Sequence, residues 1–296
     1  SDAGARGDAG AFRQFRDRLD KLYRDPANTQ AFDSELARQV SRRAAEAFAD
    51  ADLNAVVARA LARVLADMSV PETFDALLAG LRTTDAGARF LCAKGLRKLQ
   101  PSIAQDRAKL ERTVEALKAA GLVETDAVVL AWIYLALSYP GQAEAVLDAL
   151  LAIFDKRLEY RRGPAVFVDR AEVDAFDYLR QPGVLTAISV EQKAALAARL
   201  AVFLRLDAER YADADVGSDT RAQERTDLER RLDGLETCLE AIVGSSEGDI
   251  RGELRVGGHD RREAVLQQAY RWIGHPTTHK PGALNQPPWN VPIGAP

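Results

Sequence analysis

The sequence contains few of the residues from which metal sites and catalytic centres are usually built. Its 296 residues include only two cysteines, three histidines and one methionine. A structural zinc site needs closely spaced cysteine or histidine ligands, and the two cysteines, Cys92 and Cys238, are far apart. We therefore expect no cofactor. Because each cysteine falls on an apolar stripe with helical spacing, we predict two buried thiols, with one disulfide as the alternative.

Short catalytic motifs are missing as well. The sequence has no glycine-rich phosphate loop, no GxSxG elbow and no HExxH pair. Its longest apolar run, from Ala127 to Ser138, is well short of the roughly 20 residues that cross a bilayer, so we expect no membrane span. With 40 basic and 44 acidic residues and scattered basic pairs, the charge argues against a nucleic-acid partner.

The chain begins with Ser1 and not with methionine. Residues 1–10 are small and polar, which is typical of a flexible leader behind a cleavage site and equally of a trimmed start. Both an exported or periplasmic protein and a cytoplasmic one stay open on this evidence.

Helix-forming residues are abundant, and no segment alternates with the period of a strand. Ser69-Val70-Pro71-Glu72 has the pattern of a capping box with proline in the first turn, and an apolar stripe with helical spacing follows over 74–81. A second helix is predicted after a short loop in which Thr84 or Asp85 is the cap, and Pro101 is expected to end it. Ala88, Ala93 and Gly95 are small enough for a neighbouring helix to approach closely.

A short pattern repeats in this region. Ala58-Arg59-Ala60-Leu61 recurs as Ala88-Arg89-Phe90-Leu91, each time on a segment with helical periodicity. Helix pairs that repeat at short intervals are typical of an α-solenoid, in which each unit buries its apolar face against the next.

The clearest unit resembles a HEAT repeat, the armadillo-type pairing of two antiparallel helices. The matching positions are Asp85, Ala88, Arg89, Ala93, Leu96 and Leu99. The resemblance covers about residues 28–158. It implies an all-α superhelix of antiparallel helix pairs, with an extended surface on which polypeptide partners dock.

The rest of the chain is predicted to be helical but less regular. We expect a leader over 1–10, a HEAT-like array over 11–158, further helices over 159–273 and a proline-rich tail over 274–296 that lies extended against the body. Residues 244–258 look like a linker. A long helix over 220–243 carries leucines at heptad spacing, which pack within the chain or, alternatively, form a homodimer. These leucines are Leu228, Leu232, Leu235 and Leu239.

Three groups of residues are candidate sites. The irregular segment 159–170 combines basic and aromatic side chains suited to an anionic ligand or an acidic partner, or it is only a crossover between helical layers. Its candidate binding residues are Tyr160, Arg161, Arg162, Phe167 and Arg170. Weak metal candidates are His259, His275 and His279, whose clustering is better explained by chance and exposure. Alternating carboxylates in a loop can bind calcium, but the acidic residues near a polar break do not meet the EF-hand pattern. They are Asp207, Glu209, Asp213, Asp215 and Asp219.

Two functions follow as hypotheses. The first is a non-enzymatic helical-repeat scaffold that binds a protein partner. The alternative is an all-helical enzyme or small-ligand-binding protein with a cleft near the 159–170 loop and the C-terminal tail.

Overall fold

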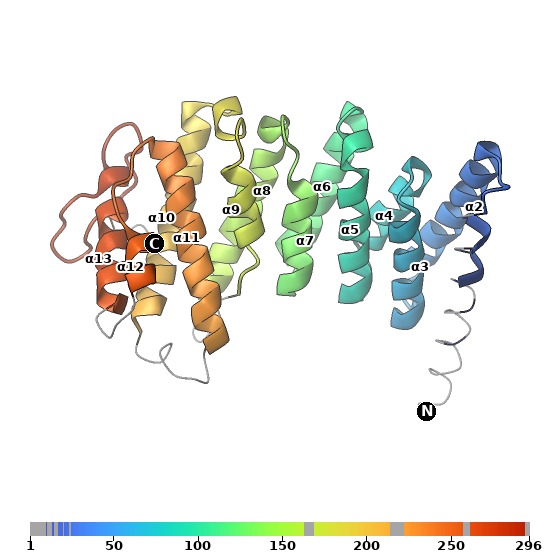
Figure 1. The fold of residues 1–296 in the computed structure, drawn as a ribbon, viewed down its shortest axis with the longest axis horizontal. Coiled ribbons are helices and arrows are strands. Elements are labelled where there is room, and N and C mark those ends of the chain that lie inside the picture. The colour runs from blue at the N-terminus through green and yellow to red at the C-terminus, as the bar shows by residue number, and fades with distance from the viewer. Residues whose placement is uncertain are drawn as a thin grey trace. The chain divides into compact units, whose positions relative to one another are not determined.

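The computed structural model describes residues 25–162, 169–213, 222–256 and 261–293, and near the N-terminus residues 10, 14, 17–19 and 21–23. All regular secondary structure in these ranges is helical, which confirms the all-α class (Figure 1). No helix among them is long and apolar enough to cross a bilayer. The chain divides into two compact units, Ser1–Leu137 and Ser138–Pro296.

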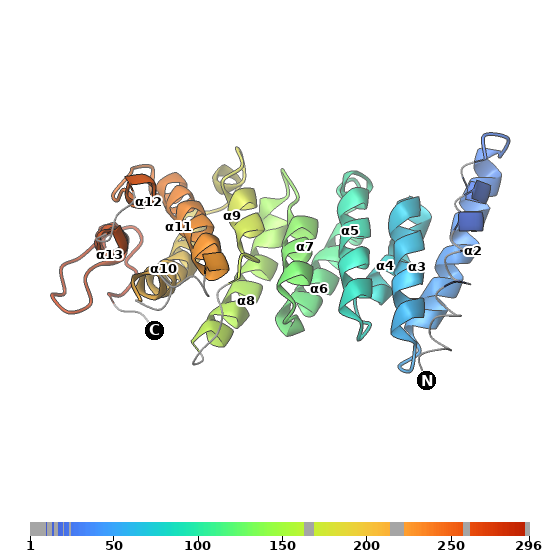
Figure 2. The ribbon, with the colours of Figure 1, turned by 60° about the horizontal axis from the view of Figure 1, so that its bottom comes forward.

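The first unit consists of helix pairs in two layers. Its elements are α2 (Gln30–Phe48), α3 (Ala55–Met68), η1 (Pro71–Thr73), α4 (Phe74–Gly80), α5 (Ala86–Ile103), α6 (Arg107–Val123) and α7 (Ala127–Leu137). Helices α3, α5 and α7 pack side by side, and α2 packs on α4 in the other layer (Figures 1 and 2). The arrangement is compatible with a helical solenoid.

Helix starts in this unit follow the side chains that cap them. Asn54, Asp85 and Asp106 accept hydrogen bonds from the first-turn N–H groups of α3, α5 and α6. Asp85, and not Thr84, is therefore the cap of α5.

The capping box expected at Ser69 does not form. Ser69 instead ends α3 in the left-handed conformation, with φ 48°. Pro71 holds Val70 in an extended conformation, so the chain makes the 3₁₀ turn η1 before α4 begins. The prediction was wrong because the residue before a proline avoids the helical region.

Pro101 does not end its helix either, since α5 continues to Ile103. The proline lies in the last turn and removes only its own N–H donor, while two further residues continue the helix. The Gln100 side chain donates to the carbonyl oxygens of Leu135 and Ala136 at 3.0 and 2.8 Å, which ties this turn to α7.

Glycine allows close packing at the centre of the first unit. A Cβ atom at Gly95 would lie 2.7 Å from Leu77 Cδ2 and 3.3 Å from the backbone of Ala66. Helix α5 thus meets α3 and α4 at this point without room for a side chain, as the small residues predicted.

The second unit is built around one long central helix. Its elements are α8 (Ala143–Arg161), α9 (Val173–Leu179), η2 (Leu185–Ala187), α10 (Val190–Ala212), α11 (Ala222–Val243), α12 (Ile250–Val256), α13 (Arg261–Ile273) and η5 (Ala283–Asn285). Helix α10 packs against α8, α11 and α13. Helix α12 lies within the stretch 244–258 that was predicted to be a linker. The Glu236 carboxylate accepts hydrogen bonds from the N–H groups of Ile250 and Arg251, at 2.7 and 2.9 Å, and so supports the start of α12.

The leucine seam of α11 is used inside the chain. All four leucines, Leu228, Leu232, Leu235 and Leu239, are fully buried within the second unit. They are therefore not available to a second protomer, and the homodimer alternative through these residues is not retained. Cys238 is buried among them, Cys92 is buried in the first unit, and both are free thiols.

Residues 274–293 fold back onto α13 and α10 through turns and η5. Leu284 and Val291 are buried there. The Asn285 side chain joins both ends of the segment, because Oδ1 accepts from Gly282 N at 2.6 Å and Nδ2 donates to Val291 O at 2.7 Å.

Candidate functional site

The predicted binding segment 159–170 is described at residues 159–162 and 169–170, and Phe167 lies outside the described residues. Tyr160 is 49% exposed, and Arg162 and Arg170 are exposed as well. Arg161 points inward, with only 5% of its side chain accessible. The candidate cations are thus divided between surface and interior, and the binding role of Tyr160, Arg162 and Arg170 stays a prediction.

Arg161 belongs to a buried charge cluster in the second unit. The cluster consists of three arginines and three carboxylates: Arg157, Arg161, Arg231, Asp169, Glu172 and Asp207. Arg231 donates to Asp207 at 2.9 Å and also binds Glu172. Arg157 donates to Glu172 at 2.5 Å and to Asp169 at 2.9 Å, and Arg161 pairs with Asp207.

Aromatic rings and opposite charges both stabilise this cluster. The Arg231 guanidinium lies over the rings of Phe203 and Phe176, at 5.4 and 5.8 Å from their centres. Burial alone would raise the pKa of Glu172, but Arg231, Arg157 and Arg161 outweigh it and hold that pKa at about 2.

The charges within the cluster balance, so it carries no net charge to offer a ligand. Among the described residues, Nη1 of Arg161 and Nη2 of Arg231 have no hydrogen-bond partner, and both atoms are shielded from solvent. Neither arginine lines the cavity beside Arg205, the one beside Leu78 or the one beside His275. The geometry is that of an internal tie between α8, α9, α10 and α11.

Sequence reasoning missed this cluster and misread Asp207. That residue was grouped with four other acidic residues near a polar break, but its side chain is fully buried between Arg161 and Arg231. Asp213 pairs with Arg210, while Asp215 and Asp219 lie outside the described residues. Glu172 and Arg231 are 59 positions apart, and no local spacing signals such a pair.

The histidines do not assemble a metal site in the described part of the chain, where no cluster of three potential ligands occurs. His259 lies outside that part. His275 Nδ1 accepts from the backbone N–H groups of Thr277 and Thr278 at 3.2 and 3.3 Å, and its ring packs 4.6 Å from Tyr270. His279 is exposed and has a φ of 53°.

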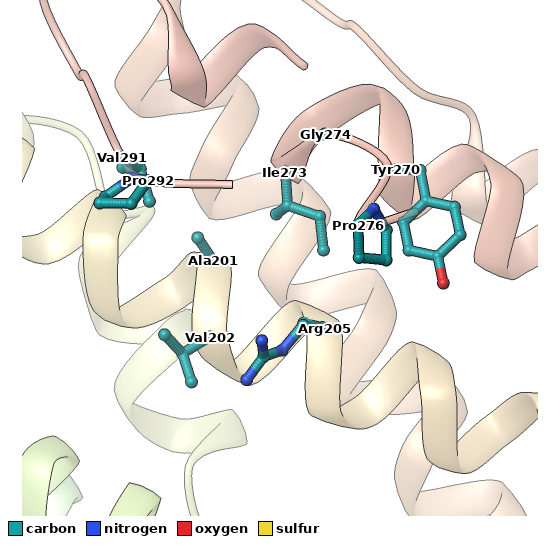
Figure 3. A pocket seen from close by; sticks show the side chains of 9 residues that line it. All are labelled: Ala201, Val202, Arg205, Tyr270, Ile273, Gly274, Pro276, Val291 and Pro292. Carbon is teal, nitrogen blue, oxygen red and sulfur yellow. The ribbon is translucent and has the colours of Figure 1, made fainter. Parts of the chain in front are cut away.

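Two hollows lie near the folded-back tail. The smaller is about 20 Å³, which is room for one water, and Figure 3 shows Arg205 and Val202 projecting from α10 beside Tyr270 and Ile273 of α13. The Nε atom of Arg205 is buried there without a partner among the described residues. The larger hollow, of about 560 Å³, is lined by polar side chains that include Arg271, His275 and Lys280.

Aromatic side chains meet at the surface of the first unit. Phe90 of α5 and Trp132 of α7 pack edge to face, with 5.5 Å between ring centres. The ammonium group of Lys94 lies 5.6 Å from the Trp132 ring centre. All three residues are partly exposed. The repeated pattern Ala88-Arg89-Phe90-Leu91 predicted this helix, but periodicity alone did not identify Phe90 and Trp132 as a surface pair.

Comparison of the chain with protein-family models, with curated proteins and with solved structures found no match.

Proposed function

We propose that this chain is a non-enzymatic helical-repeat module of HEAT-like pairs that binds a polypeptide partner on its α3–α5–α7 layer. The observation that carries the proposal is the uncovered apolar stripe of α7. An all-helical layer with such a stripe provides an extended docking surface of the kind that repeat proteins use.

Helix α7 consists of eleven apolar residues, including the aromatic pair Trp132 and Tyr134. One side, including Leu130 and Ile133, is fully buried. The other side presents Val128, which is 61% exposed, and the partly exposed Trp132 and Leu135, at i, i+4 and i+7. A helix that faced only water on that side would carry polar residues there, so an exposed apolar stripe favours a binding surface.

The neighbouring helix α5 adds positive charge beside the stripe. Lys94 lies against Trp132. Lys98 is exposed on the α3 side of α5, where it donates to the carbonyl oxygen of Ala66 at 2.7 Å. The partner that fits is a segment with apolar side chains for the stripe and acidic side chains for the lysines. Tryptophan at the centre of an interface is a frequent energetic anchor.

The test is selection of peptides from a random displayed library against the full chain. We expect selected peptides to combine aliphatic or aromatic residues with Asp and Glu. Their affinity should fall at least tenfold for Trp132→Ala, which corresponds to about 1.4 kcal/mol, because the stripe loses its largest anchor. Phe32→Ala removes an exposed aromatic residue from α2, outside the α3–α5–α7 layer, and serves as the matched control.

Two results would contradict the proposal. One is the absence of any peptide that binds above an unrelated helical protein. The other is a set of peptides whose affinity is the same for the wild type and for Trp132→Ala.

A small-ligand-binding protein is the second candidate function, and the 560 Å³ hollow beside the tail favours it. Arg271, His275 and Lys280 line that hollow together with Glu247, so a small anion is the ligand class that fits. Titration with inorganic phosphate and with citrate, followed by NMR of the His275 ring, would test it. If the anions change the His275 ring shifts equally in Lys280→Gln and in the wild type, the hollow is excluded as their binding site.

A further inference from the structure

The two neighbouring helices α4 and α6 leave a cleft between them in the first unit. They meet near their N-terminal ends, where Arg112 binds Asp75 at 2.6 Å and lies over the Phe74 ring. Helix α4 has only seven residues and α6 has seventeen, and contact between the two is sparse elsewhere. The resulting α4–α6 cleft has a volume of about 330 Å³.

Most of the cleft is apolar. Its apolar lining consists of Leu78, Leu81, Ala116, Ala119, Ala120 and Val123. Val123, the last residue of α6, is 79% exposed. The three alanines on α6 have short side chains, so the protein does not fill the space with its own atoms.

One wall of the cleft is a closed ion pair. Glu124 accepts two hydrogen bonds from Arg89, at 2.7 and 2.9 Å, and two more from the N–H groups of Thr125 and Asp126. Burial raises the pKa of Glu124, but Arg89 and the backbone donors outweigh it and lower that pKa. Arg89 also donates to the carbonyl oxygens of Thr83 and Thr84. The Arg89–Glu124 pair is therefore neutral, and its hydrogen bonds are made within the protein.

Arg82 is different. It lines the cleft and is exposed, and its guanidinium has no hydrogen-bond or ion-pair partner among the described residues. With Arg89 and Glu124 cancelling each other, Arg82 supplies the net positive charge of the described lining. A guanidinium offers a planar pair of N–H donors that matches a carboxylate.

We propose that the α4–α6 cleft binds an apolar monocarboxylate, that is, a hydrocarbon chain or ring that ends in one carboxylate. The hydrocarbon lies against Leu78, Leu81 and the α6 alanines, and the carboxylate pairs with Arg82. The volume is at the lower end of the roughly 300–1,000 Å³ of small-ligand sites, which favours a short ligand. This site does not involve the α7 stripe, so it stands apart from the polypeptide-binding proposal.

The test compares three probes of the same length with different head groups. Octanoate, 1-octanol and octylammonium are titrated below their micelle concentrations into the full chain, with ligand-observed NMR as the readout. We expect octanoate to bind about tenfold more tightly than octanol, because a charge-assisted pair with Arg82 is added to the same apolar contact. Octylammonium should be the weakest of the three.

Variants test the contact with the head group and the contact with the apolar lining separately. Arg82→Gln should reduce octanoate affinity to that of octanol and leave octanol unchanged, which a general loss of structure would not do. Ala116→Leu should weaken both ligands, because the larger side chain fills the cleft. Arg107→Gln, which removes a solvent-exposed cation from the same helix, is the control and should change neither affinity.

The proposal is overturned if octanoate does not bind, if octanol binds equally well, or if octanoate affinity is unchanged by Arg82→Gln or by Ala116→Leu. Each of these results would leave the polypeptide surface on the α3–α5–α7 layer unaffected, since that surface is tested by Trp132→Ala.

Discussion

The Nε atom of Arg231 donates a 2.9 Å hydrogen bond to Asp207 at a place where both side chains are completely excluded from water. Removing two charges from water is costly, and their attraction compensates only when the remaining hydrogen bonds are also made. Here Glu172 on one side and Arg161 on the other complete the neutral cluster. The pair thus fixes how α10 and α11 pack within the second unit.

Loss of one member of the cluster should therefore strongly destabilise the protein. We expect Arg231→Met to lower the free energy of unfolding by about 3–5 kcal/mol, because the three carboxylates of the cluster are then left with only two arginines and one negative charge is not compensated. Arg199→Met removes a partly exposed pair with Asp155 and should cost less than about 1 kcal/mol. Urea unfolding followed by circular dichroism measures both, and equal effects would argue against the cluster as the tie of the unit.

Acid should weaken the same cluster in a defined range of pH. Glu172 has a folded pKa of about 2 against an ordinary value of 4.5, so it is a carboxyl group whose pKa is lowered by folding. Its contribution to stability is fully present above about pH 4.5 and is lost as the pH falls toward 2.

The measurement is the free energy of unfolding as a function of pH for wild type and Glu172→Gln. We expect the glutamine variant to be less stable at pH 7 and to lose less further stability between pH 4.5 and 2. Parallel curves for the two proteins across that range would show that Glu172 is not the responsible group.

Two glycines of α5 provide a matched test of packing in the first unit. At Gly95 a methyl group would meet Leu77 and the backbone of Ala66, so Gly95→Ala should destabilise the protein by about 1–3 kcal/mol. At Gly87 the nearest atoms belong to the flexible Arg59 side chain, and Gly87→Ala should be neutral or stabilising by up to about 1 kcal/mol. In thermal unfolding, the midpoint temperature of Gly95→Ala should be lower than that of the wild type, and that of Gly87→Ala should be equal or higher. A lower midpoint temperature for both variants would contradict the geometry.

The sequence predicted those parts of the fold that depend on local chemistry. Asp85 caps α5 because a carboxylate near a free first-turn N–H is a short-range interaction. The heptad spacing of α11 likewise predicted a buried seam, since periodicity records which face is apolar. The division into two units after Leu137 depends on contacts throughout the chain, and no local sequence feature predicts it.

Features that depend on distant partners could not be predicted. Helix α12 forms in a glycine-rich stretch because Glu236, fourteen positions earlier, accepts from the Ile250 N–H. The candidate site shows the same limit. Arg161 and Arg162 are neighbours with identical side chains, but only Arg161 meets Asp207, 46 positions away, and becomes buried. The stripe over 74–81 predicted the short helix α4, but it did not show that α6 lies beside it and leaves the α4–α6 cleft open.

The two free cysteines should be unreactive in the folded protein. Both are fully buried, and burial raises the pKa of the Cys92 thiol strongly and that of Cys238 to about 12. The thiolate is the reactive form, so a disulfide reagent should modify neither residue in native buffer at pH 8 and both in denaturant. Rapid modification of one thiol in native buffer would show that its helix opens locally.

Attachment of the tail should depend on one side chain. Asn285 holds Gly282 and Val291 together with two hydrogen bonds, and Leu284 is buried beside it. Asn285→Ala removes both bonds and leaves a polar backbone group at each end without its partner, a loss of about 1–3 kcal/mol. We expect chymotrypsin to cleave after Trp289 faster in this variant, because the turn in which the Trp289 and Asn290 N–H groups donate to the Gln286 carbonyl oxygen would open more often. Gln286→Ala changes an exposed amide next to it and is the control. If both variants are cleaved at the wild-type rate, burial of Leu284 and Val291 alone holds the tail, and the Asn285 bonds are not required.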